Sequence, residues 1–162
     1  MENYDNIKKH KLILKHDVGA LFVFIDENQV YHEYNFSKED VFIDLREIVT
    51  SCFDPLDGDE IGPLTCGCGV PGCAGFYHFH SEIIGNEIIW DVNHGDDLFR
   101  FDRNQYIEEV KTRLEEIKEL CEKSGKGIEY FPAGCFYIGL KDINELLSNF
   151  SKIQKEVMSN EA

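Results

Sequence analysis

Three of the six cysteines in this chain fall within eight residues, at Cys66, Cys68 and Cys73. Their spacing is Cys-x-Cys-x4-Cys, and glycine or proline fills four of the five intervening positions. Because a glycine-rich backbone turns tightly, the three thiolates can point at one centre. Thiolates are the ligands that zinc prefers in structural sites. The spacing therefore predicts a metal site, with zinc as the expected ion.

A tetrahedral zinc needs a fourth ligand beyond these three thiolates. His78 and His80 follow on an expected strand, and residues two apart on a strand share one face. His94, in the loop after the expected hairpin, and Cys135, on a second expected loop, are alternatives. A thiolate-rich site makes zinc a poor Lewis acid, so we expect a structural role rather than a catalytic one. The predicted metal ligands are Cys66, Cys68, Cys73, His78 and His80.

Two other readings of the cysteine turn remain open. It could be a tight turn with reduced thiols packed inside, or a thiol redox or metal-sensing switch. For a disulfide, Cys68 and Cys73 are better separated than Cys66 and Cys68. Cys52 and Cys121 lie on apolar helical stripes, and we expect both in the core.

The charge balance is strongly acidic, with 31 acidic residues against 16 basic ones and a formal net charge of −15. Such a surface repels phosphate backbones and anionic membranes, so we expect neither nucleic acid nor membrane as a partner. The charge serves solubility, and it could also form a docking surface for a basic protein. Six glutamates along the segment 104–123 would supply that surface.

The length of 162 residues predicts one domain, over 1–162. The polar N-terminus resembles no signal peptide, and no apolar run is long enough to span a bilayer. We therefore expect a cytoplasmic protein, in which thiols stay reduced and clustered cysteines bind metal before they form disulfides.

Apolar periodicity predicts a single α+β domain with an antiparallel sheet built from hairpins and about three helices. A meander is expected near the N-terminus, and Gly85-Asn86 is expected to close a hairpin directly after the cysteine turn, the two together covering about 61–92. The expected strands are 11–16, 20–25, 29–34, 74–84, 86–92, 98–101 and 127–131, and the expected helices begin near Ser37, Asn104 and Asp142.

Two acidic segments also have compositions that could support a calcium site or acid–base chemistry. The segment 54–63 holds four carboxylates but lacks the order of a calcium-binding loop, so we expect a solvated loop. The segment 91–97 combines His94 with three aspartates, a composition that suits general acid–base chemistry and also ordinary turns.

The cysteine turn resembles a group of small uncharacterised bacterial proteins that carry a TCxCGxxxCAG pattern, followed by a strand tryptophan and an F-D-R-x-x-Y helix start. Here these features are Thr65–Gly75, Trp90 and Phe101–Tyr106, within about 61–110. Some similar small acidic proteins are immunity factors for bacterial toxins. The resemblance implies a bacterial protein and an association with toxin immunity, and it brings no established activity.

The sequence thus favours a non-enzymatic protein with a structural zinc and an acidic interaction surface, with an immunity-like role among its expected uses. The alternatives are a zinc-dependent hydrolase, using His78, His80 or His94 with Asp91 or Asp96, and the thiol switch. The chain has no phosphate-binding loop, nucleophile elbow or His-Glu-x-x-His helix.

Overall fold

The structure, a computed structural model, describes residues 4–17, 20–29, 42–43, 45–58, 64–65, 79–92, 97–125, 128–130 and 136–160. Its elements in chain order are β1 (Lys9–His10), β2 (Leu12–Asp17), β3 (Ala20–Ile25), β4 (Asn28–Gln29), β5 (Phe42–Ile43), α1 (Leu45–Ser51), β6 (Leu56–Gly58), β7 (Leu64–Thr65), β8 (Phe79–Ile84), β9 (Glu87–Val92), β10 (Asp97–Asp102), α2 (Arg103–Ser124), β11 (Ile128–Tyr130), β12 (Phe136–Ile138) and α3 (Leu140–Asn160). The predicted α+β class is confirmed, with three helices in the described residues.

The largest sheet has five strands in the order β1-β10-β9-β8-β6. Its strands pair antiparallel except at one edge, where β1 runs parallel to β10 and Lys9 pairs with Arg100. The sheet is therefore mixed, and the expectation of a purely antiparallel sheet was wrong. A long connection, unlike a hairpin, lets a strand join in either direction, and most of the chain separates β1 from β10.

A smaller sheet, β2-β3-β4, forms the predicted N-terminal meander. The strand predicted over 20–25 matches β3, and β2 covers the strand predicted over 11–16 with a shift of one residue. Asp26 takes a left-handed backbone conformation (φ 58°) in the turn between β3 and β4. Only residues 28–29 of the third strand are described, and 30–34 lie outside the described residues.

The predicted Gly85-Asn86 turn is confirmed. Ile84 pairs with Glu87 across it, and Gly85 has a φ of 57° that favours glycine. Residues 74–78 of its first strand lie outside the described residues. Leu56–Gly58, expected to be loop, instead forms the edge strand β6, where Leu56 is buried.

The predicted long helix is confirmed as α2. Asp102 caps its first turn by accepting a hydrogen bond from the Gln105 amide (3.0 Å), and Gly125 ends it with a φ of 65°. The helix expected from Ser37 was wrong in part, because Phe42–Ile43 pairs with β7 and α1 begins only at Leu45. Pairing with a distant strand overrode the local helical spacing there.

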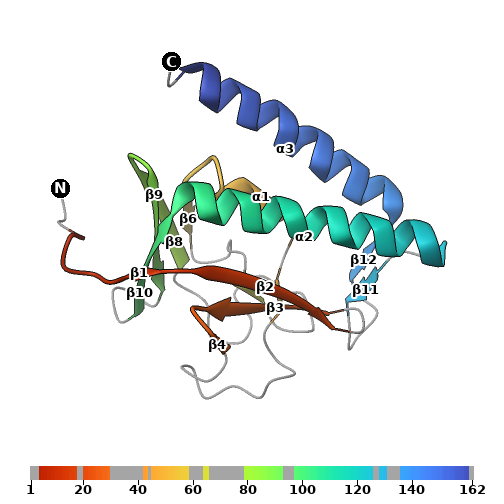
Figure 1. Ribbon diagram of the computed structural model, residues 1–162, viewed down its shortest axis with the longest axis horizontal. Helices are drawn as coiled ribbons and strands as arrows, with labels where there is room; N and C mark the ends of the chain where they lie inside the picture. Colours follow the sequence, from red (N-terminus) through yellow and green to blue (C-terminus); the bar gives the residue numbers. More distant parts are fainter. Residues whose placement is uncertain are drawn as a thin grey trace.

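Helix α2 lies between the small sheet and α3 (Figure 1). Figure 1 shows α2 running along the body with β2 and β3 below it and α3 above it, and the C-terminal end of α3 standing away from the rest. One hydrophobic cluster joins β2, the large sheet and all three helices. No helix in the described part of the chain has the length and apolar character needed to cross a membrane.

Candidate functional site

Most of the predicted metal ligands lie outside the described residues. This holds for Cys66, Cys68, Cys73 and His78, and for the alternative ligands His94 and Cys135. The remaining predicted ligand, His80, is the second residue of β8 and is half-buried. Cys52 and Cys121, predicted to be core residues, are buried with exposures of 0% and 2%. This prediction is confirmed.

His80 occupies the middle of three neighbouring strands. Asp57 on β6 and Asp91 on β9 are its cross-strand partners, so the three positions stand side by side in the sheet. Since Phe79 and Ser81 point into the core, His80 faces the opposite side. Within the described ranges, no three histidine, cysteine or acidic side chains gather closely enough to hold a metal ion.

A second candidate site is the outer face of α2. Its inner face carries seven buried residues, while four glutamates follow one line along the exposed side. These residues, called the glutamate stripe below, are Glu108, Glu115, Glu119 and Glu122.

Lysines neutralise only half of this stripe. Lys123 Nζ lies 3.6 Å from Glu119, and Lys118 Nζ lies 3.9 Å from Glu122. Glu108 and Glu115 form no ion pair with any residue that the structure describes. The N-terminal half of the stripe is therefore the part with uncompensated negative charge.

Aromatic packing fixes α2 against the large sheet. Trp90, at the centre of β9, meets Phe101 and Tyr106 edge-to-face at centroid distances of 5.0 and 5.8 Å. The Tyr106 hydroxyl lies 2.6 Å from Ser51 Oγ, which donates to the Ile48 carbonyl (2.7 Å). This chain of contacts ties α1, α2 and β9 together, so the helix surface has a rigid support.

Two buried groups near this junction, the Tyr106 hydroxyl and the Cys52 thiol, stay protonated and uncharged. Burial raises the pKa of Tyr106 well above its ordinary value, and the nearby Cys52 raises it further. Burial also raises the pKa of Cys52 well above that of a free thiol, against the opposing effect of Arg103. Arg103 Nε donates to the Cys52 carbonyl oxygen at 3.2 Å. A protonated, enclosed thiol is a poor nucleophile, so Cys52 serves packing rather than chemistry.

Sequence reasoning missed the contacts between α2 and the edge of β2. The side chain of Gln105 makes two hydrogen bonds with the backbone of Leu12. Its oxygen accepts from the Leu12 N–H (3.1 Å), and its nitrogen donates to the Leu12 carbonyl (2.8 Å). Glu109 accepts a hydrogen bond from the Leu14 backbone N–H at 2.8 Å. It also accepts one from the Arg113 guanidinium at 3.4 Å, and this Glu109–Arg113 pair is expected from the four-residue spacing. The helix thus satisfies backbone groups that an edge strand leaves open. No local signal in the sequence distinguishes Glu109 from the exposed glutamates.

A second missed residue, Arg100, fastens the N-terminal segment. Its Nη1 donates to the carbonyls of Tyr4, Asp5 and Ile7 at 3.3, 3.4 and 3.3 Å, while its Nε donates to Glu87 at 2.7 Å. Hydrogen bonds from Arg100 and from Lys9 lower the pKa of Glu87. These contacts stabilise the fold. Arg100 and Glu87 are occupied by their mutual hydrogen bond, so we assign them no acid–base role.

Comparison of the chain with family models, curated proteins and solved structures gives no match.

Proposed function

We propose that this chain is a non-enzymatic, cytoplasmic binding protein whose glutamate stripe docks a basic protein partner. The observation that carries the proposal is the line of four exposed glutamates on a helix whose other face is buried in the core. A rigid row of like charges attracts a basic surface over distance and speeds the encounter. The formal net charge of −15 extends the same attraction over the molecule.

The experiment should separate docking at the stripe from general charge attraction. Arginine- and lysine-rich peptides selected by the wild-type chain from a display library serve as probes. Glu108→Lys/Glu115→Lys places opposite charge on the stripe, while Glu27→Lys/Asp54→Lys makes the same charge change at two exposed sites outside α2. We expect the stripe variant to lose binding about 100-fold and the control to lose much less, because truncating charged contacts costs several kcal/mol only where they form. Equal losses in both variants would overturn the proposal.

The proposal includes a structural zinc at the cysteine turn, held by Cys66, Cys68 and Cys73 with His78 or His80 as the fourth ligand. It is supported by the thiolate spacing and by the half-buried position of His80 on the strand that follows the turn. Elemental analysis of untagged protein should give about one zinc per chain. The Cys66→Ser/Cys68→Ser variant should lose that zinc and melt at lower temperature. A metal-free wild-type protein would contradict this part alone and leave the docking face untouched.

The alternative of a zinc-dependent hydrolase draws on one observation. His80 and Asp91 are cross-strand partners, and a carboxylate beside a ligating histidine is a common arrangement in metal sites. Hydrolysis also needs an open position on the metal. An Asp91→Asn variant separates the two functions, because it leaves the histidine ligand in place. Loss of hydrolysis of an activated ester, with zinc content retained, would favour the enzyme.

A further inference from the structure

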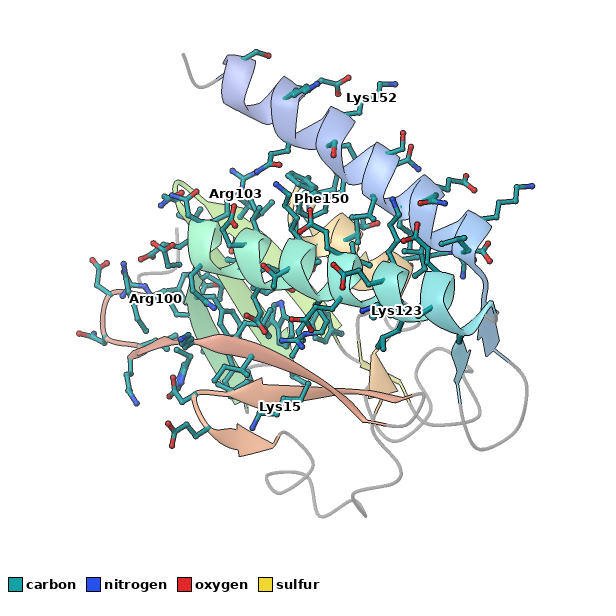
Figure 2. All side chains as sticks on the ribbon, turned by 45° about the vertical axis from the view of Figure 1, so that its right-hand side comes forward. Lys15, Arg100, Arg103, Lys123, Phe150 and Lys152 are labelled. Carbon is teal, nitrogen blue, oxygen red and sulfur yellow. The ribbon has the colours of Figure 1, made fainter. Side chains whose placement is uncertain are left out.

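The outer face of α3 has charged residues that the fold does not use. On its inner side, Ile143, Leu146 and Phe150 are buried, with exposures of 0%, 9% and 0%. Figure 2 shows Phe150 and Lys152 on opposite sides of the helix, Phe150 toward the body and Lys152 away from it. The exposed residues on the outer side are Lys141, Glu145, Ser148, Asn149, Lys152, Lys155 and Glu156.

The charge of this helix differs from that of the molecule. Residues 140–160 contain three lysines and three carboxylates, so their net charge is zero, whereas the whole chain carries −15. Two copies of so acidic a chain repel each other where their acidic faces meet. The outer face of α3 is a surface on which a second copy can approach without that repulsion.

The order of the charges along α3 distinguishes two ways of pairing. With two copies antiparallel and Ser148 opposite Asn149, Glu145 of each copy faces Lys152 of the other. In the same register Lys141 faces Glu156, and each contact occurs twice because a two-fold axis relates the copies. A parallel arrangement would instead place like charges against each other. The sequence of the helix is thus complementary to itself in one direction only.

These charges have no partners within the described chain. Lys141 and Glu145 are four residues apart, as are Lys152 and Glu156, a spacing that allows pairs along a helix. The structure forms neither pair, and none of the four residues makes an ion pair with another described residue. On α2, by contrast, Lys118 and Lys123 do pair with glutamates of their own helix.

A groove runs beside the same face, between α1 and α3, with a volume of about 590 Å³. Its apolar lining includes Val49, Leu146 and Ile153, and Glu145 and Lys152 stand along its edge. A helix of a second copy lying there would cover apolar surface as well as pair charges. Ser148, at the middle of the outer face, is small enough to let two helices approach closely.

We propose that the chain forms a two-fold symmetric homodimer through antiparallel packing of α3 on α3, specified by Glu145–Lys152 and Lys141–Glu156 contacts between copies. The interface is separate from the glutamate stripe on α2, so the dimer presents two stripes to basic partners.

Charge reversal tests the pairing directly, using sedimentation equilibrium of the full chain across protein and salt concentrations. We expect the wild type to dimerise and the dimer to weaken with salt, because exposed ion pairs are screened. Glu145→Lys or Lys152→Glu alone should lower the association constant at least about tenfold, since each brings like charges together twice. The double variant Glu145→Lys/Lys152→Glu restores opposite charges between copies and should recover most of the association.

Matched controls on α2 make the same charge changes away from the interface. Glu119→Lys and Lys123→Glu, both exposed, should leave the association constant unchanged. A wild type that stays monomeric throughout, equal losses in the α2 controls, or no recovery in a double variant with wild-type circular dichroism would overturn the proposal.

A second readout does not depend on charge. Ser148→Cys places a thiol beside the two-fold axis, so mild oxidation should join two chains into a covalent dimer. Ser124→Cys, at the exposed end of α2, should not do so at the same rate. Equal crosslinking at both positions would contradict the proposed geometry.

Discussion

The two long helices have nearly the same length, 22 residues for α2 and 21 for α3, but different relations to the core. Seven residues of α2 are buried against sheets and helices, and its Gln105 and Glu109 hydrogen-bond to β2. In α3 one stripe of apolar residues packs on the core, and Lys141, Glu145, Lys152 and Glu156 form no ion pair with another described residue. Length and amphipathicity alone therefore do not tell whether a helix belongs to the core or lies over it. The number of sides it buries does.

The largest expected difference between the helices is in the cost of cavities. Leu114→Ala on α2, where the side chain is 0% exposed, should lower the free energy of unfolding by about 2–5 kcal/mol. Leu147→Ala on α3, where the side chain is half-buried, should cost about 1–2 kcal/mol, because less apolar surface leaves water there. Urea denaturation followed by circular dichroism measures both. Equal costs would mean that α3 is as much a part of the core as α2.

A smaller effect should come from the contact between α2 and β2. Glu109→Ala leaves the Leu14 amide without its acceptor, and an unsatisfied buried amide costs about 1–3 kcal/mol. Its neighbour Glu108 is exposed, so Glu108→Ala should change stability by less than about 0.5 kcal/mol. The same urea titration compares the two variants. Similar losses would show that solvent replaces the Glu109 contact without cost.

Removing the N-terminal cap of α2 or of α3 should change the stability by a smaller amount. Asp102→Ala removes the acceptor of the Gln105 amide at the start of α2 and should cost about 1 kcal/mol. Asp142, which accepts from the Gly139 amide at the start of α3 (3.0 Å), should matter less when replaced by alanine, because α3 buries fewer described side chains than α2. Thermal unfolding of both variants provides the measurement. A larger shift for Asp142→Ala would reverse this order.

The smallest effect should depend on pH, at Asp26. Its partial burial acts to raise its pKa, but hydrogen bonds from the Lys11 amide, His10 and Lys8 outweigh this and lower the pKa to about 2. Because the folded pKa lies below the ordinary aspartate value of 3.8, the stabilisation is fully present above pH 3.8 and is lost as the pH falls toward 2. Solvent screening limits it to on the order of 1 kcal/mol.

Asp26→Asn tests this contribution without disturbing the turn, since asparagine tolerates the left-handed backbone at that position. Between pH 4 and pH 2 the free energy of unfolding should fall less steeply in the variant than in the wild type. Parallel curves would show that Asp26 contributes nothing to the acid sensitivity of the fold.

The sequence predicted those elements that are determined by residues close together in the chain. The apolar spacing of α2, its end at Gly125 and the Gly85-Asn86 turn follow from neighbouring residues. The strands Phe42–Ile43 and Leu56–Gly58 were not foreseen, because each forms by pairing with a distant segment. The parallel placement of β1 beside β10 has the same origin.

The candidate sites divide in the same way. The glutamate stripe follows from helical periodicity, which places Glu108, Glu115, Glu119 and Glu122 together whatever lies beneath them. The neighbours of His80 depend on strand register, so spacing alone could not bring Asp57 and Asp91 beside it. The assignment of Cys66, Cys68 and Cys73 to a zinc site stays a prediction from sequence.

The guanidinium of Arg100 donates hydrogen bonds to three backbone carbonyls of residues 4–7, so this segment can be fixed only after Arg100 has been synthesised. Residues 4–10 leave the ribosome well before their hydrogen-bond partners on β10, which are made almost a hundred residues later. The backbone amides of Leu12 and Leu14 on β2 likewise have their acceptors only once Gln105 and Glu109 have been synthesised. The hairpin β8–β9, with β10 and α2 following at once, can form from neighbouring segments. Residues 4–14 are therefore held in place only after β10 and α2 have been made, and the nascent chain must keep them from pairing elsewhere until then.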